Sequence, residues 1–181
     1  MPSKFLKCFV LLIFVSILSC TSQDEEQIMP IEGKIPDEEA DSIMVVATTN
    51  DRLDYEMTAV HMYKYYDTKQ TFVDTVFVTF YNDDGTVKST LRSDKAEMDD
   101  AANTITGIGN VVVISDNGTM KAPYAVLNKN TEQIFAQKGV TMIRGENTLY
   151  GEEMVSDMRL DRVEITKVSA EGKLDNEEID W

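Results

Sequence analysis

Cysteine, histidine and basic side chains are scarce in this sequence. Its 181 residues include two cysteines and one histidine, too few for a Cys/His zinc site or a Cys/His catalytic pair. Only 17 Lys and Arg oppose 32 Asp and Glu, which gives a formal net charge of −15. Such an acidic chain has no general positive field for nucleic acid or anionic headgroups. The composition predicts no metal, no cofactor and no nucleic-acid partner.

Long apolar runs are also lacking. The one sustained run, Phe9–Leu18, follows Lys4 and Lys7 and is shorter than the roughly 20 residues that span a bilayer. This order is typical of a secretory signal, predicted over residues 1–19. A small residue and then Cys20 end the run, which resembles the lipobox of bacterial lipoproteins. The resemblance implies cleavage before Cys20 and diacylation of its sulfur. The alternatives are a plain cleaved signal or an uncleaved anchor helix.

Two acidic segments flank the central region. Cys8 lies within the predicted signal, so cleavage would leave Cys20 as the one cysteine and the mature chain could form no internal disulfide. Loss of Lys4 and Lys7 would leave a formal net charge of about −17. Residues 20–42 are rich in Gln, Asp, Glu and Pro and are predicted to form a flexible tether. Residues 175–181 are predicted to form an acidic C-terminal tail. The run Gln23–Glu26 resembles surface-export tags, so placement in the outer membrane or on the surface is an alternative.

Short runs of Val, Ile, Thr, Tyr and Phe, separated by Asp, Asn and Gly, fill residues 43–174. No stretch keeps the three-to-four-residue apolar period of a helix, so antiparallel strands are predicted. The longest hairpin is expected at Val73–Thr90, with its tip at Asn82–Gly85. Residues 43–174 are therefore predicted to be one all-β domain.

A repeat runs through this region. Three copies begin at Thr90, Thr119 and Thr148, each 29 residues after the one before. The shared pattern is Thr, a large apolar residue, any residue, a small residue, two variable positions and an apolar residue. A polar break follows in each copy, at Asp99, Asn128 and Asp157. A looser copy occurs at Met57–Met62. Units this short fold only by stacking on one another.

The apolar positions change face within each copy. Alternate side chains of a strand share a face, yet Leu91 and Ser93 have one parity whereas Ala96 and Met98 have the other. The strand must therefore bulge or kink at Asp94–Lys95 for both halves to point inward.

The other copies fit the same kink. Pro123, which cannot donate to a sheet ladder, stands at that point in the second copy. Ser93, Ala122 and Gly151 are small residues that leave room where the strand bends. The fold predicted is a curved antiparallel β-repeat array with an apolar concave side and free strand edges at both ends.

These repeats resemble the LptC family of lipopolysaccharide-transport proteins and, more broadly, the OstA-like superfamily that includes LptA. The segments that carry the resemblance are Leu91–Met98, Gly109–Val111, Asn117–Thr119 and Met120–Leu127. The resemblance implies an OstA-like half jelly roll whose apolar groove holds lipopolysaccharide acyl chains. It also implies that lipid comes from an inner-membrane ABC transporter complex and passes to an LptA-like bridge protein through paired strand edges.

The resemblance implies a place at the periplasmic face of the inner membrane. Known LptC proteins keep a transmembrane helix there, whereas this chain is predicted to be anchored by lipid on Cys20.

The inward residues of the repeats are the predicted groove lining. Several are methionines, whose flexible side chains suit variable acyl chains. The alternative for each residue is a place in a closed core. The predicted lining comprises Met57, Met62, Leu91, Met98, Val111, Val113, Met120, Leu127, Phe135, Val140, Met142, Leu149 and Met154.

No catalytic constellation is present in the sequence. The acidic pairs Asp99–Asp100 and Glu152–Glu153 fall at a turn and at the kink, where solvated charge is expected. An envelope hydrolase is therefore disfavoured, and a non-enzymatic lipid carrier is predicted. The alternative is a surface or periplasmic β-repeat lipoprotein that acts as a scaffold or adhesin.

Overall fold

The computed structural model describes residue 31 and residues 33–171, and every regular element in that part of the chain is a β-strand. No helix long and apolar enough to cross a membrane occurs among these residues. The predicted signal (1–19), the lipid-attachment residue Cys20, most of the predicted tether and the predicted tail (175–181) lie outside the described residues.

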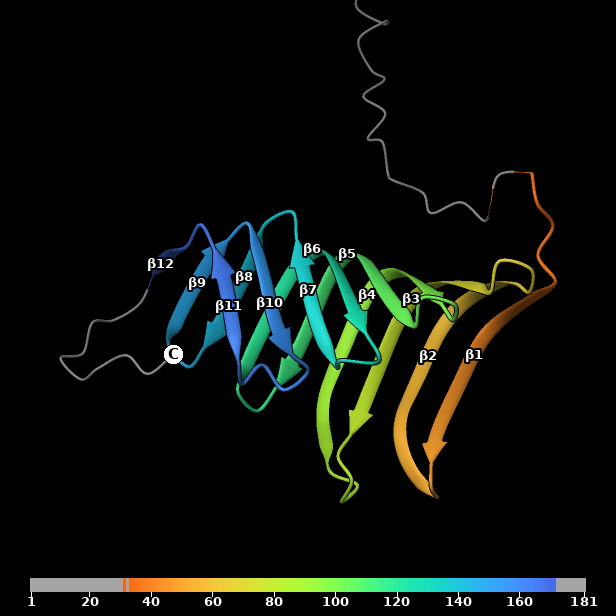
Figure 1. The fold of residues 1–181 in the computed structure, drawn as a ribbon, viewed down its shortest axis with the longest axis horizontal. Helices are drawn as coiled ribbons and strands as arrows, with labels where there is room; N and C mark the ends of the chain where they lie inside the picture. Colours follow the sequence, from red (N-terminus) through yellow and green to blue (C-terminus); the bar gives the residue numbers. More distant parts are fainter. Residues whose placement is uncertain (1–30, 32, 172–181) are drawn as a thin grey trace, which may run out of the picture.

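The strands form one open antiparallel sheet in which consecutive strands mostly pair with each other, as Figure 1 shows. This confirms the all-β prediction. In chain order they are β1 (Glu38–Thr49), β2 (Arg52–Tyr65), β3 (Gln70–Tyr81), β4 (Val87–Asp99), β5 (Thr104–Ser115), β6 (Gly118–Asn128), β7 (Gln133–Gln137), β8 (Val140–Arg144), β9 (Asn147–Gly151), β10 (Glu153–Asp157), β11 (Val163–Thr166) and β12 (Ser169–Glu171).

The first strand begins at Glu38, earlier than the predicted domain start at residue 43. Residues 38–41 pair with β2, and the only histidine, His61, contacts their acidic side chains. Its Nδ1 lies 2.5 Å from Asp41 Oδ1 and its Nε2 lies 3.3 Å from Glu39 Oε1. An edge strand can pair through its backbone alone and keep charged side chains in solvent. The polar sequence of residues 38–41 therefore did not indicate a strand.

A crease crosses every long strand. Between β4 and β5 the register shifts from Arg92 to Lys95, and between β5 and β6 it shifts from Ile108 to Val111. This confirms a bulge where Asp94–Lys95 and Pro123 predicted one. The extra residue lies on β5, however, where Gly109 and Asn110 have φ of 73° and 46°.

Residues with left-handed backbone recur at the crease on alternate strands. Ser42, Thr75 and Asn110 have φ of 55°, 54° and 46° on β1, β3 and β5. Between β7 and β8, Lys138 and Gly139 have φ of 67° and 94°. In each hairpin, one strand thus bends at the crease through a residue with positive φ, and the other bends there with negative φ.

The crease divides the structure into two facing layers. Residues Tyr124–Asn128 of β6 pair with β7, whereas Thr119–Lys121 pair with β8. From there β7, β10 and β11 continue one layer, and β8, β9 and β12 continue the other. We name these the β11 layer and the β12 layer. In Figure 1, β10 and β11 lie in front of β8 and β9.

Cross-strand pairing places the repeat positions in continuous apolar rows. In the β12 layer one row joins nine residues by direct pairing: Val45, Met57, Val78, Leu91, Val113, Met120, Met142, Leu149 and Ala170. In the β11 layer a row of mostly small residues lies next to the crease: Ala96, Gly107, Ala125 and Ala136. Small residues there let the two layers approach each other closely.

Gly151, the small residue of the third copy, lies in a crowded place. A Cβ at this position would overlap the Ile165 side chain and would lie 2.8 Å from the Thr166 carbonyl oxygen. The role predicted for Gly151 at the bend therefore has a direct steric basis.

We predict that Gly151→Ala lowers the free energy of unfolding by about 3 kcal/mol, because a backbone carbonyl cannot move aside as a flexible side chain can. Gly85→Ala is the control, since its φ is 82° but no atom lies within 4 Å of its added Cβ. That control should lose only about 1 kcal/mol, the cost of left-handed backbone. Urea unfolding of both variants measures the difference, and equal losses would contradict the steric explanation.

Candidate functional site

The candidate site is the apolar space between the two layers. Nine predicted lining residues are buried in its core, namely Met57, Leu91, Val111, Val113, Met120, Leu127, Val140, Met142 and Met154. Three more, Met62, Met98 and Leu149, are partly buried and pack against it. The structure therefore brings together the residues that the repeat singled out.

Phe135 is the exception, and its predicted inward position is wrong. Its side chain is 40% exposed, whereas Ile134 and Ala136 on either side are 2% and 0% exposed. Because neighbours in a strand point to opposite faces, inward Ile134 and Ala136 force Phe135 outward. In the sequence, Ile105, Ile134 and Val163 recur at 29-residue spacing, which marks Ile134 and not Phe135 as the repeated apolar position.

The interior is packed with its own side chains. A small apolar cavity lies between Tyr55, Met57 and Leu91 of the β12 layer and Met98 and Leu127 of the β11 layer. Its free volume is about 10 Å³, barely the room that one water molecule needs. An acyl chain can therefore enter only where side chains or layers move.

A larger hollow of about 920 Å³ opens at the edge away from the crease. We call it the mouth. Tyr55, Phe80, Ile105 and Leu127 line both the mouth and the small cavity, so the two lie side by side. The predicted lining did not include Tyr55, Phe80 or Ile105, although all three lie at inward parity in their strands.

Charged side chains of both signs surround the mouth. Its lining includes four cations, Arg52, Lys88, Lys129 and Arg159, and four carboxylates, Asp54, Asp83, Asp84 and Glu132. This local balance differs from the chain as a whole, which has nearly twice as many acidic as basic residues. The mouth therefore carries cations and carboxylates in equal number.

Two polar contacts join the layers across the mouth. Lys88 Nζ of β4 lies 2.5 Å from Glu132 Oε2 in the β6–β7 turn. Arg159 Nη2, in the loop after β10, donates to Asn82 Oδ1 at 2.5 Å. Such solvent-accessible contacts contribute little stability, about 1 kcal/mol or less each, so they can open at low cost.

The tyrosines near the mouth stay neutral at neutral pH. Burial raises the pKa of Tyr55 above its usual value, and the charges of Asp100 and Asp54 add to the effect. A hydrogen bond to Glu56 raises the pKa of the Tyr81 hydroxyl. Hydrogen bonds from Thr86 lower the pKa of Asp84, so that this carboxylate stays ionised. The mouth thus offers neutral phenols beside fixed charges.

The β10–β11 loop covers one stretch of the mouth. Met158 is 6% exposed and Leu160 is fully buried, and both belong to the apolar core. Ser115 Oγ donates to Arg159 O at 2.6 Å, and Arg144 Nη2 donates to Leu160 O at 2.5 Å. These donors belong to the β12 layer, whereas the loop connects two strands of the β11 layer. Sequence reasoning missed this loop because its apolar residues do not follow a strand pattern.

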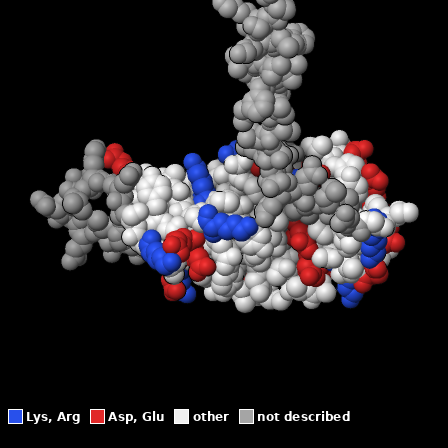
Figure 2. Space-filling view, turned by 90° about the horizontal axis from the view of Figure 1, so that it is seen from above, with Lys and Arg blue, Asp and Glu red and all other residues white. Residues whose placement is uncertain are grey.

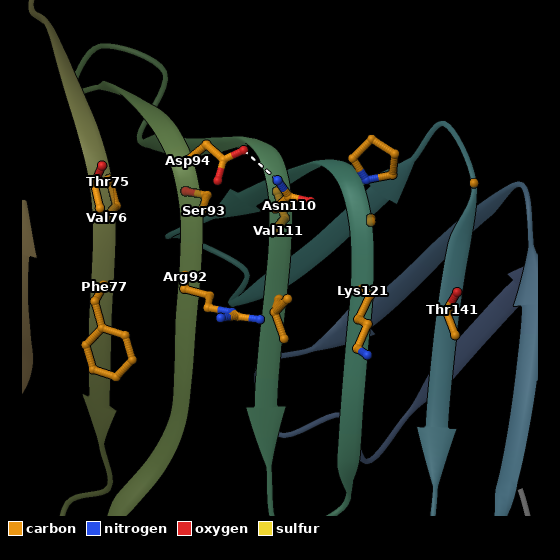
Figure 3. A pocket seen from close by; sticks show the side chains of 14 residues that line it. Thr75, Val76, Phe77, Arg92, Ser93, Asp94, Asn110, Val111, Lys121 and Thr141 are labelled. Atoms are coloured by element: carbon orange, nitrogen blue, oxygen red, sulfur yellow. Dashed lines mark hydrogen bonds between the residues drawn. The ribbon is translucent and has the colours of Figure 1, made fainter.

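A second hollow, of about 790 Å³, lies on the outer surface along the crease (Figure 3). Phe77, Arg92, Lys121 and Thr141 line it from neighbouring strands, and Asn110 donates to Asp94 Oδ2 at 2.7 Å beside it. Val76, Val111 and Ala122, which belong to the buried core, line it as well. The hollow therefore reaches the apolar core at the crease.

Comparison with protein families identifies the relatives of this fold. The sequence model described as LptC, lipopolysaccharide-assembly, LptC-related, matches residues 9–171. The chain belongs to the LptC family. A comparison with curated proteins found no match.

A solved structure of an LptA homologue has the same fold as this LptC-family chain. It is LptH, the periplasmic component of the lipopolysaccharide-transport device of Pseudomonas aeruginosa. The TM-score is 0.52 at 13% identity, over 66% of this chain and 94% of LptH. The predicted OstA-like fold is therefore confirmed.

Family membership gives this LptC-family protein a role in lipopolysaccharide transport in the cell envelope. The family consists of transport proteins. Among the residues that the structure describes, no group of His, Cys, Asp and Glu is arranged to hold a metal ion.

The contrast between Leu127 and Phe135 provides a test of the site. They lie on paired strands, and Leu127 is 4% exposed whereas Phe135 is 40% exposed. We expect Leu127→Ala to lower the free energy of unfolding by about 2–4 kcal/mol, because it leaves a cavity in the core. Phe135→Ala should cost less than about 1 kcal/mol. Urea unfolding checks both values, and a larger loss for Phe135→Ala would reverse the assignment of faces.

Proposed function

We propose that this protein is a non-enzymatic lipid carrier that holds lipopolysaccharide acyl chains between its two layers during export. The observation that carries the proposal is the apolar interior that adjoins a charged mouth at Tyr55, Phe80, Ile105 and Leu127. Acyl chains match the apolar character of the interior and would enter as its side chains or layers move, and phosphorylated sugars would meet the cations at the mouth.

The energetics of such a carrier are reversible. Burial of an acyl chain stabilises the complex by about 0.8 kcal/mol per methylene, and the same amount is lost on release. A passive interior therefore cannot impose a direction. In the proposed route an inner-membrane ABC transporter complex supplies the lipid and the direction, and an LptA-like bridge protein receives it.

Free strand edges support the proposed transfer. β1 pairs on one side only, and β11 and β12 end the two layers at the opposite end. Backbone groups on such edges can accept a strand of a neighbouring protein. Acidic residues Glu38, Glu39 and Asp41 lie on β1, and the view from above shows acidic side chains at that end (Figure 2). A partner strand with basic or neutral side chains therefore suits the β1 edge.

The proposed anchor is diacylated Cys20, which the acidic tether connects to the β-domain at the periplasmic face of the inner membrane. The tether ends where β1 begins, at Glu38. The lipid would hold the domain near the transporter without a membrane-spanning helix.

We predict lipid adducts at inward positions. A photo-crosslinking amino acid at Met120 or Leu127 should form lipopolysaccharide adducts in cells, because these side chains are 0% and 4% exposed and face the interior. Phe135 is the matched control, since it lies on a neighbouring strand but points outward. Immunoblotting for lipopolysaccharide detects the adducts. Normal expression without adducts at any inward position would contradict the carrier and favour a scaffold.

We also predict that Cys20 carries the anchor. In cells fed labelled palmitate, the unaltered protein should incorporate label and fractionate with the inner membrane. Cys20→Ala should lose the label, whereas Cys8→Ala, the matched control in the predicted signal, should keep it. Recovery of the labelled protein in the outer membrane or on the surface would contradict partnership with an inner-membrane transporter.

A further inference from the structure

We infer that the β10–β11 loop is a displaceable plug, and that the space now filled by Met158 and Leu160 is a subsite for an acyl chain. The inference rests on the proposed carrier function. It concerns how the packed interior becomes available to lipid.

The loop fills the interior with side chains that belong to neither layer. Leu160 is fully buried and Met158 is 6% exposed, although both lie between β10 and β11 rather than in a strand. Met158 also lines the mouth beside Ile105 and Leu127. The space that these two side chains occupy is thus apolar, continuous with the mouth and enclosed by both layers. An acyl chain there would replace one set of apolar contacts by another.

The loop is held in place by a small set of polar contacts. Ser115 Oγ and Asn117 Nδ2 donate to Arg159 O at 2.6 and 3.1 Å. Arg144 Nη2 donates to Leu160 O at 2.5 Å. We call these three donors, Ser115, Asn117 and Arg144, the latch. All three come from the β12 layer, so the latch joins the layers without contributing to the strand pairing of either.

The closed position carries backbone strain. Leu160 has φ of 57°, a left-handed conformation that a bulky residue rarely adopts. Such a conformation persists only where surrounding contacts enforce it, and here the latch and the burial of the side chain do so. Release of the loop relieves this strain and breaks no strand pairing, because the loop lies between β10 and β11. The loop can therefore open while the sheet stays intact.

Two variants test the plug in the full-length protein with purified lipopolysaccharide as the probe. Ser115→Ala combined with Arg144→Met weakens the latch and leaves the interior side chains unchanged. Leu160→Ala shortens the plug and leaves the latch donors unchanged. Because a rarely open state lowers apparent affinity by its population, each variant should bind lipopolysaccharide about fivefold to tenfold more tightly. Gly151→Ala, which is destabilised at the crease, is the control and should show no gain.

Hydrogen exchange gives an independent measurement. The amide of Leu160 donates to Asp157 O at 3.2 Å, and that of Asp161 donates to Asp157 Oδ1 at 2.9 Å. Saturating lipopolysaccharide should speed exchange of both amides about tenfold or more, as expected for an element that opens locally. The amides that pair β5 with β6 should not exchange faster.

The outcomes separate the two proposals. If lipopolysaccharide binds and the loop amides stay as protected as before, or if neither variant binds more tightly than Gly151→Ala, the plug is refuted and the carrier stands. If the protein and all its variants fail to bind lipopolysaccharide, the carrier and the plug are refuted together.

Discussion

A β-strand presents successive side chains to opposite faces, and the long strands of this protein can bury apolar residues along their whole length only by reversing that order part-way. The crease performs the reversal. On one side of it Leu91 and Ser93 point inward, and on the other Ala96 and Met98 do so. Without the crease, half of each apolar set would face water. The two layers, the interior between them and the mouth opposite the crease all follow from this one geometric requirement.

The change of face explains which structural features could be predicted from the sequence. Parity at Leu91 and Ala96, repeated at 29-residue spacing, predicts a bulge, and the register shifts occur there. The strand that takes the extra residue was not predictable, because Asp94 and Pro123 marked β4 and β6 whereas Gly109 and Asn110 on β5 adopt positive φ. A local sequence pattern shows that the register of two paired strands must shift, but it does not show which strand carries the extra residue.

The errors have equally specific causes. Phe135 is predicted to be an inward residue of the repeats, although the parity of Ile134 requires the reverse. Residues 38–41 were assigned to the tether because they are acidic, whereas β1 takes them as an edge strand. Met158 and Leu160 escaped notice because burial in a loop depends on tertiary contacts, such as the bond from Arg144, which spacing along the chain does not encode. Tertiary contacts of this kind also decide whether an apolar interior is filled.

The 29-residue register has a consequence for the size of the molecule. Each copy adds a pair of strand passages and contributes its own share of both apolar rows, while the ends of the array contact only their immediate neighbours. Insertion of one more copy would lengthen the interior by two strand spacings, about 10 Å, and leave β1, β11 and β12 with the partners they have now. The number of 29-residue copies thus sets the length of the apolar interior. Duplication of a copy can change that length while the strands at both ends keep their partners.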